Sequence, residues 1–206
     1  MASTRIAALI LASTVLLTGC GTCPVNVFLP PGTRAINALK NRTAPPAAAD
    51  FDRGLTLEAM LAPGHDRDRW QPARAGAIEG YVVRVHEAGT ESANCFAGSR
   101  RDAHVEVAVR PDAAPNQRVI VEITPRMRDW AATRGMDWST RTLQSRLTGR
   151  RARIEGWWLF DAEHARESEN TQPGHGANWR ATAWELHPVT AILPYPAGRG
   201  DKGFIH

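Results

Sequence analysis

Alternating apolar and polar positions recur through the second half of the chain and predict β-strands. The clearest alternation is Ala103–Val109, where one face would carry only alanine and valine and the other would carry His104 and Glu106. Such a period of two is typical of a half-buried strand. Runs rich in β-branched and aromatic residues predict four more strands, over residues 78–86, 118–124, 151–160 and 181–193.

A helical pattern separates the third predicted strand from the fourth. Leu143 and Leu147 lie four residues apart, Ser139 stands at a suitable N-cap, and Gly149 follows the last turn. A shorter helix is expected over 55–62, before Pro63. Three strands, a helix and two strands is the order of the OB-fold, a five-stranded barrel. We therefore expect a mainly β, OB-like barrel over residues 76–195, with a sandwich of two small sheets as the alternative.

The segment before the barrel has a different pattern. Prolines interrupt residues 21–49, and a run of alanines follows at 47–49. Proline-rich segments are extended and semi-rigid, so residues 20–75 are expected to form an extended Pro/Ala-rich arm with one possible short helix. Residues 196–206 are expected to be a C-terminal tail.

The N-terminal residues have the pattern of an export signal. Arg5 precedes an apolar run, Ile6–Leu17, which is shorter than the roughly 20 residues that a spanning helix needs. The run ends in Leu-Thr-Gly-Cys at residues 17–20. This motif resembles the lipobox of bacterial lipoproteins, which implies cleavage after residue 19 and lipid on Cys20. Gly21 after the cysteine implies no inner-membrane retention, and so favours the periplasmic face of the outer membrane.

The remaining cysteines and the overall charge add weaker constraints. Cys23 and Cys95 would lie in an oxidising compartment, where they could pair or where one could stay free or bond another chain. Apolar residues make up 43% of the chain, enough for one core. The formal charge of +4 is mildly basic and would attract acidic ligands or anionic head groups.

Three clusters of polar residues interrupt the apolar pattern of the strands. They occupy residues 102–106, 161–164 and 185–187. His104 and Glu106 would share one face of a strand, as would Glu185 and His187, because each pair is two residues apart. With apolar residues pointing inward, both pairs are expected to face water. If the first strand separates the second from the fifth, the pairs would lie on one wall.

This arrangement suggests a site made of imidazoles and carboxylates. A divalent metal could be held by four ligands, His104, Glu106, His164 and His187, with Glu185 as a base and Arg180 as a charge stabiliser. Acid–base chemistry without metal is a second possibility. The alternative is that each carboxylate only satisfies the histidine beside it, since no zinc motif is present.

Basic residues gather around the predicted helix and the fourth strand. Arg150, Arg151 and Arg153, with Trp157, are candidates for ligand binding, because arginine beside aromatic rings is how OB-folds hold nucleic acids or sugars. The alternative is that most of the seven tryptophans fill the barrel.

Three stretches, over residues 119–126, 156–161 and 178–190, resemble a set of uncharacterised bacterial secreted and lipoprotein domains, which implies a shared domain but no mechanism. The sequence thus favours an envelope lipoprotein that binds an anionic glycan, lipid head group, nucleic acid or protein partner. A metal-dependent, phosphodiesterase-like hydrolase and a purely structural envelope protein are the alternatives.

Overall fold

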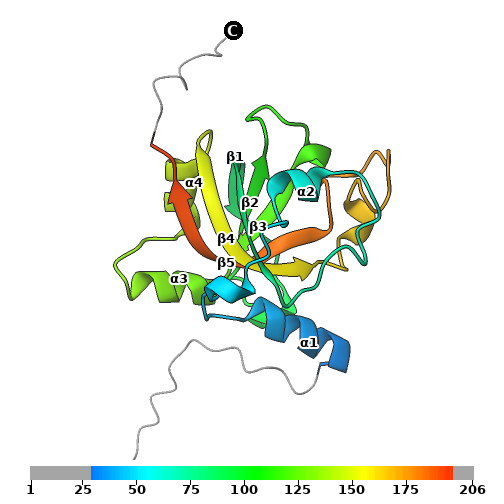
Figure 1. Cartoon of the computed structure of the whole chain (residues 1–206). Coiled ribbons are helices and arrows are strands. Elements are labelled where there is room, and N and C mark those ends of the chain that lie inside the picture. Colours follow the sequence, from blue (N-terminus) through cyan, green and yellow to red (C-terminus); the bar gives the residue numbers. More distant parts are fainter. Residues whose placement is uncertain (1–28, 197–206) are drawn as a thin grey trace, which may run out of the picture.

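The computed structural model describes residues 29–196, which fold as a closed barrel of five strands (Figure 1). The strands are β1 (Ala75–Glu87), β2 (Ala103–Ala108), β3 (Val119–Ile123), β4 (Arg151–Phe160) and β5 (Trp184–Pro194). Their order around the barrel is β1-β2-β3-β5-β4, and β4 pairs with β1 to close it. The β3–β5 pair is parallel and the other pairs are antiparallel. This confirms the predicted OB-like barrel.

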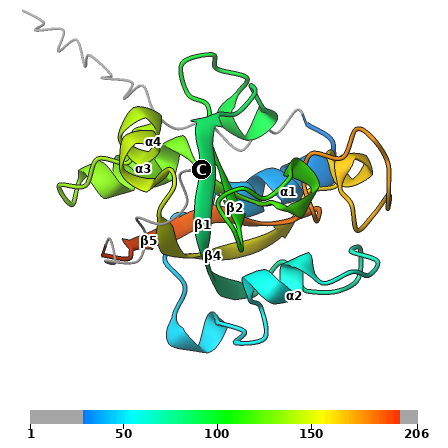
Figure 2. The ribbon, with the colours of Figure 1, turned by 90° about the horizontal axis from the view of Figure 1, so that it is seen from above.

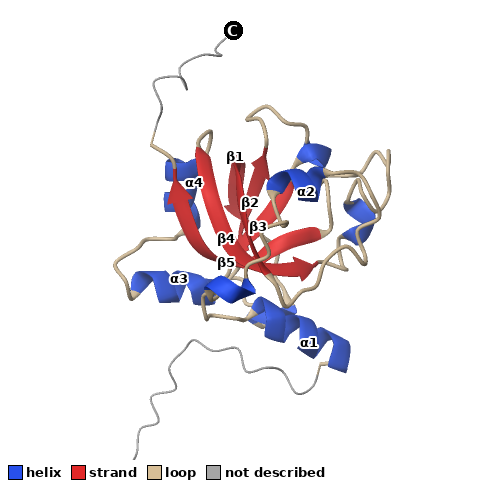
Figure 3. Ribbon diagram, viewed as in Figure 1, coloured by secondary structure: helices blue, strands red, loops and turns tan. Residues whose placement is uncertain are grey.

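Short helices surround the barrel (Figure 3). The α-helices are α1 (Pro31–Lys40), α2 (Leu57–Leu61), α3 (Pro125–Ala132) and α4 (Thr140–Leu147). The 3₁₀ turns are η1 (Ala48–Asp50), η2 (Ser92–Asn94), η3 (Pro115–Gln117) and η4 (Ala165–Glu167). Figure 2 shows α3 and α4 on one side of the barrel and α2 on the other. Two helices, where the sequence predicted one, therefore connect β3 to β4.

Local sequence explains both of these helices. Pro125 ends β3 and also occupies the first turn of α3, where its missing N–H costs nothing. The hydroxyl of Thr124 accepts a hydrogen bond from the Met127 N–H at 3.2 Å. Ser139 caps α4 in the same way, as predicted.

The segment predicted as an extended arm is different in the structure. Residues 31–40 form α1, which contacts η2 and β5. Pro31 lies in the first turn of α1, the one place where a helix accepts proline readily. Arg42 then donates hydrogen bonds to the carbonyl groups of Trp158 at 3.3 Å and His187 at 3.4 Å. The described part of the arm therefore packs on the barrel.

Tryptophan and aliphatic side chains fill the barrel. Trp158 and Trp184 are fully buried, and Trp70 stacks on Trp158 with ring centroids 5.4 Å apart. Gly76 on β1 leaves the space that the Trp158 ring occupies, because a β-carbon there would overlap the indole. Five of the seven tryptophans belong to the core or pack against it, as one of the two expectations for them held: Trp70, Trp130, Trp138, Trp158 and Trp184.

Candidate functional site

The strand alternation places the predicted histidine–glutamate pairs outside the barrel core, yet they are not open to water. On β2 and β5 the intervening residues belong to the core cluster: Ala103, Val105, Val107, Trp184, Leu186. His104, Glu106, Glu185 and His187 therefore point away from it, as predicted. The expectation that both pairs face water is wrong, because Glu185 and His187 have no exposed surface.

A second layer of chain covers these outward-facing side chains. It contains α1, the segment around η2 and the connection from β4 to β5. Lys40 on α1 is buried, as are Asn94 at η2 and Arg180 in the connection. The strand pattern could not reveal this layer, because its contacts join residues far apart in the sequence.

The predicted site assumed that the first strand separates the second from the fifth, and the observed strand order is different. The strand between β2 and β5 is β3, not β1. Glu122 of β3 therefore lies between the two histidines. Its carboxylate pairs with His104 Nε2, and its Oε2 lies 3.3 Å from His187 Nδ1. Sequence reasoning missed Glu122, although a lone carboxylate within the apolar run 119–123 was a usable signal.

Four side chains from separate segments converge beside His187. We call Glu91, Asp102, Glu122 and His187 the carboxylate–histidine cluster, because each offers a ligand atom and these atoms all lie within 4.8 Å of one another. Asp102 Oδ2 lies 3.4 Å from His187 Nε2. Both atoms are buried, and neither has a hydrogen-bond partner.

Lys40 supplies a positive charge at the rim of this cluster. Its Nζ lies 2.5 Å from Glu91 Oε2. Burial alone would lower the pKa of Lys40, but the carboxylates of Glu122 and Glu91 outweigh burial and raise that pKa. The lysine therefore stays charged inside the second layer.

Arg180 forms the other buried cationic centre. It donates hydrogen bonds to Asp161 at 2.8 Å, to Glu185 at 2.9 Å and to the Thr182 carbonyl at 2.8 Å. The second oxygen of Glu185 lies 3.0 Å from His187 Nδ1. The predicted base and charge stabiliser thus form a fully buried ion pair beside the carboxylate–histidine cluster.

Of the four predicted metal ligands, only His187 belongs to the cluster. His104 contacts it through Glu122. His164 instead pairs with Asp161 at 2.7 Å, and Glu106 pairs with Arg118 at 2.7 Å. The structure therefore does not bring the four predicted ligands together around one point.

Burial and neighbouring charges set the protonation of the cluster. Burial would raise the pKa of Glu122, but His104 and His187 outweigh it and hold that pKa well below its usual range. Burial would lower the pKa of His104, and the charge of Glu122 raises it instead. For Asp102, burial raises the pKa most, and the neighbouring carboxyl group of Glu91 raises it further. The His104–Glu122 pair is thus favoured as ions, whereas Asp102 favours its proton.

A pocket of about 390 Å³ adjoins this region on the outer face of β1 and β2. His104 forms part of the wall of this pocket, and its ring stacks on the ring of Trp179 with the centroids 6.3 Å apart. Arg84 and Arg118 also line it, but both lie against Glu106, at 3.5 Å and 2.7 Å. Their charges are therefore already partly neutralised.

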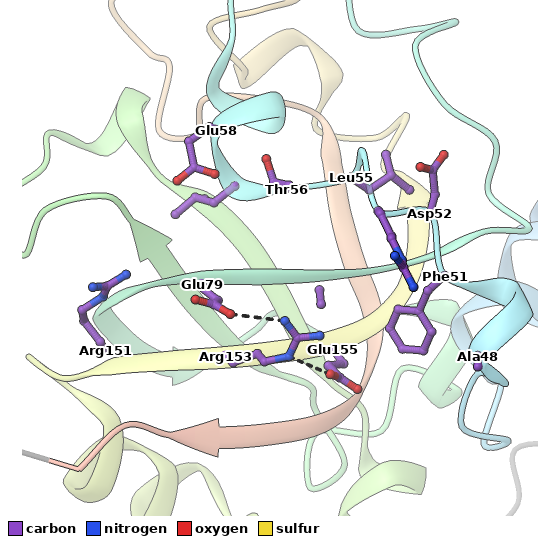
Figure 4. Close-up of a pocket in the computed structure, with 13 residues that line it drawn as sticks. Ala48, Phe51, Asp52, Leu55, Thr56, Glu58, Glu79, Arg151, Arg153 and Glu155 are labelled. Atoms are coloured by element: carbon purple, nitrogen blue, oxygen red, sulfur yellow. Dashed lines mark hydrogen bonds and ion pairs between the residues drawn. The ribbon is translucent and has the colours of Figure 1, made fainter.

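Two of the predicted ligand-binding residues already contact polar groups of the chain, and the other two form no ion pair within residues 29–196. Arg153 lies between Glu79 at 3.2 Å and Glu155 at 2.9 Å, in a pocket of about 670 Å³ (Figure 4). The Trp157 indole donates a hydrogen bond to the Ala44 carbonyl at 3.0 Å. Arg151 lines the same pocket without an ion pair among the described residues. Arg150 is exposed and is likewise unpaired there.

These free arginines belong to a larger basic stretch. Residues 138–154 contain five arginines and no aspartate or glutamate. We call four of these arginines the arginine segment, because all are exposed and form no ion pair within residues 29–196: Arg141, Arg146, Arg150 and Arg151. They lie on α4 and at the turn into β4.

Two further findings concern the covalent and membrane context. Cys95, which follows η2, is disulfide-bonded. No helix within residues 29–196 has the length and apolar character to cross a membrane. The proposed lipid site, Cys20, and Cys23 lie outside the described residues.

Comparisons with known proteins add no assignment. No family model matches the chain, and neither a curated protein nor a solved structure matches it.

Proposed function

We propose that this protein is a cell-envelope lipoprotein, anchored through Cys20, whose OB-like barrel binds an anionic ligand through the arginine segment. The observation that carries this proposal is the state of Arg141, Arg146, Arg150 and Arg151. All four are exposed, and none forms an ion pair within residues 29–196; Asp137 and Glu79 act on Arg146 and Arg151 only at longer range. Their charges are therefore available to a partner.

The chemistry of arginine favours an oxyanion as that partner. A guanidinium group presents a planar set of donors that matches phosphate, sulfate or carboxylate. Exposed charges of one sign also raise the local concentration of oppositely charged ligands. Arg153 lacks this property, because Glu79 and Glu155 already occupy its donors.

The export half of the proposal has separate support. The apolar run and the Leu-Thr-Gly-Cys motif resemble a lipoprotein signal. The disulfide at Cys95 fits an oxidising compartment such as the periplasm. Several acyl chains on Cys20 would give stable anchoring, since each buried methylene contributes about 0.8 kcal/mol. We place the protein on the periplasmic face of the outer membrane.

Salt-dependent binding tests the ligand half. The mature chain, with serine in place of Cys20, is titrated with polyphosphate, with a carboxylated polysaccharide and with vesicles containing phosphatidylglycerol. We expect binding that weakens as salt rises. Each of Arg150→Gln and Arg151→Gln should lower the affinity by about fivefold, on the order of 1 kcal/mol per charge.

Arg153→Gln is the matched control, because it removes the same charge from a neighbouring but paired position. It should change the affinity by less than either of the other variants. The preferred titrant distinguishes a lipid head group from a soluble polymer. Equal affinities for all three variants, or no binding to any titrant, would contradict the arginine segment as the binding surface.

Fractionation tests the anchor. The full chain should sediment with outer membranes, and Cys20→Ser should prevent acylation and release the protein from that fraction. Recovery of unmodified Cys20 in the membrane-bound mature chain would contradict the proposal.

The hydrolase and the structural protein stay predictions. Arg180 and Glu185 have no exposed surface and are paired with each other. In this arrangement they have no access to a substrate, so we do not propose a reaction.

A further inference from the structure

We propose that the carboxylate–histidine cluster is a binding site for one divalent transition-metal ion, such as Mn²⁺ or Zn²⁺. Its ligands would be Glu91 from the segment before η2, Asp102 next to β2, Glu122 of β3 and His187 of β5. This site differs from the set of ligands that the sequence suggested, and it does not depend on the proposed anionic ligand.

The distances among the donor atoms suit a single ion. The four ligand atoms lie within 4.8 Å of one another. Ligands at about 2.1 Å from a metal lie up to about 4.2 Å apart. Side-chain movements of under about 1 Å would therefore bring all four into coordination.

Two unsatisfied atoms give independent evidence for a cation here. His187 and Asp102 are both fully buried, and His187 Nε2 and Asp102 Oδ2 lack hydrogen-bond partners. Leaving a buried polar atom unpaired costs about 1–3 kcal/mol. These two atoms lie 3.4 Å apart, a separation that two ligands of one metal commonly show. A bound ion would satisfy both.

The charges of the surrounding residues also favour a bound cation. Five largely buried carboxylates occupy this region, on Glu91, Asp102, Asp161, Glu122 and Glu185. The cations that face them are Lys40, Arg180, which is shared between Asp161 and Glu185, and His104, which pairs with Glu122. A metal would displace the proton of Asp102, and a divalent ion would then balance the two carboxylates in excess of these three cations.

The donor set indicates the class of metal. Three carboxylates suit hard ions such as Mn²⁺, whereas imidazole suits Zn²⁺ and other transition metals better than Ca²⁺ or Mg²⁺. Access is from the rim, where the side chains of Lys40 and Glu91 keep 10% and 18% of their surface exposed. Because the lysine ammonium contacts Glu91, it would compete with the metal for that ligand.

Calorimetric titration tests this site directly. The mature chain is freed of metal with a chelator and titrated with MnCl₂ and, separately, ZnCl₂. We expect one ion per chain and a rise in melting temperature with metal concentration, because an ion that binds only the folded state stabilises it. Glu122→Gln should weaken binding by at least about tenfold, the effect typical of altered metal coordination.

Glu106→Gln is the matched control. Glu106 is nearly as buried as Glu122 and points from the neighbouring strand to the same outer side, but it pairs with Arg118. This variant should bind metal as the wild type does. If Glu122→Gln and Glu106→Gln bind equally, the site is overturned.

Lys40→Met keeps the test decisive if Glu122→Gln fails to fold. Removing the competing ammonium should tighten metal binding by several-fold while leaving all four ligands in place. Absence of stoichiometric binding to both wild type and Lys40→Met would overturn the proposal. It would leave the proposed anionic ligand unaffected, because polyphosphate binding is measured without metal.

Discussion

The protein keeps charge in two contrasting regions, one buried and paired, the other exposed and unpaired. Around the carboxylate–histidine cluster, Lys40 and Arg180 are enclosed and bound to carboxylates. In the arginine segment, four exposed arginines form no ion pair within residues 29–196. The charges of the first region are therefore closed to a ligand, whereas those of the second are open to one. Substitutions in the first region should therefore lower the stability of the fold, whereas substitutions in the second should lower the affinity for an anionic ligand.

The largest effect on folding is expected for Arg180→Met. This substitution leaves Asp161 and Glu185 buried without their cation, and breaking a buried ion pair in this way costs about 3–5 kcal/mol. Urea unfolding followed by circular dichroism measures the loss. Arg153→Met removes the same charge from partly exposed pairs near the surface, where the cost is about 0.2–1 kcal/mol. Similar losses of unfolding free energy in the two variants would show that burial does not make the Arg180 ion pairs more important for stability than those of Arg153.

A smaller effect is expected from pH. The pKa of His104 is raised in the folded state, so its stabilising contribution is present below its unfolded pKa of about 6.5 and is lost as pH rises through the folded value. The raised pKa of Asp102 acts in the same direction, because ionising this buried carboxyl opposes folding. The contribution of Asp102 therefore falls above its unfolded pKa of 3.8, and that of His104 falls above 6.5, so both lower the free energy of unfolding of the metal-free protein as pH rises.

Asp102→Asn sharpens this measurement. Asparagine cannot ionise, so the decline of stability with rising pH should become shallower, and the part that remains should come from His104. Thermal melts at a series of pH values give both slopes. An unchanged slope in Asp102→Asn would show that Asp102 is not protonated in the folded state.

The smallest effect on folding is expected in the arginine segment. Arg150→Gln and Arg151→Gln should change the free energy of unfolding by no more than about 0.5 kcal/mol, as is usual for exposed positions without specific contacts. The same two variants should lose affinity for anions. A large loss of stability in either would mean that the segment has a structural role and would weaken the contrast between the regions.

Much of the barrel follows from local sequence, whereas the cluster does not. Alternation placed His104 and His187 away from the core, and Ser139 and Gly149 bounded α4 as predicted. These features depend on neighbours within a few residues. The strand order around Glu122 depends instead on the closure of the whole barrel.

The second layer of chain, which covers the outward-facing side chains of the barrel, was harder still to predict. Lys40 meets Glu91 across 51 positions of sequence, and Arg126 meets Asn41 across 85. No periodic pattern encodes such contacts. The prolines near α1 also suggested an extended chain, although Pro31 stands where a helix tolerates it. The burial of Glu185 was missed for the same reason. The strand pattern alone predicts that this side chain faces solvent, but the second layer covers it.

The disulfide at Cys95 has a consequence for how the protein sits in the envelope. The chain has three cysteines, and Cys95 is the only one among residues 29–196. If the sulfur of Cys20 is acylated as proposed and Cys95 pairs with Cys23, only Gly21 and Thr22 stand between the fatty acids and a covalent link to the β1–β2 connection, a reach of about 10–11 Å. Such a bond would hold the barrel against the lipid surface in a restricted orientation.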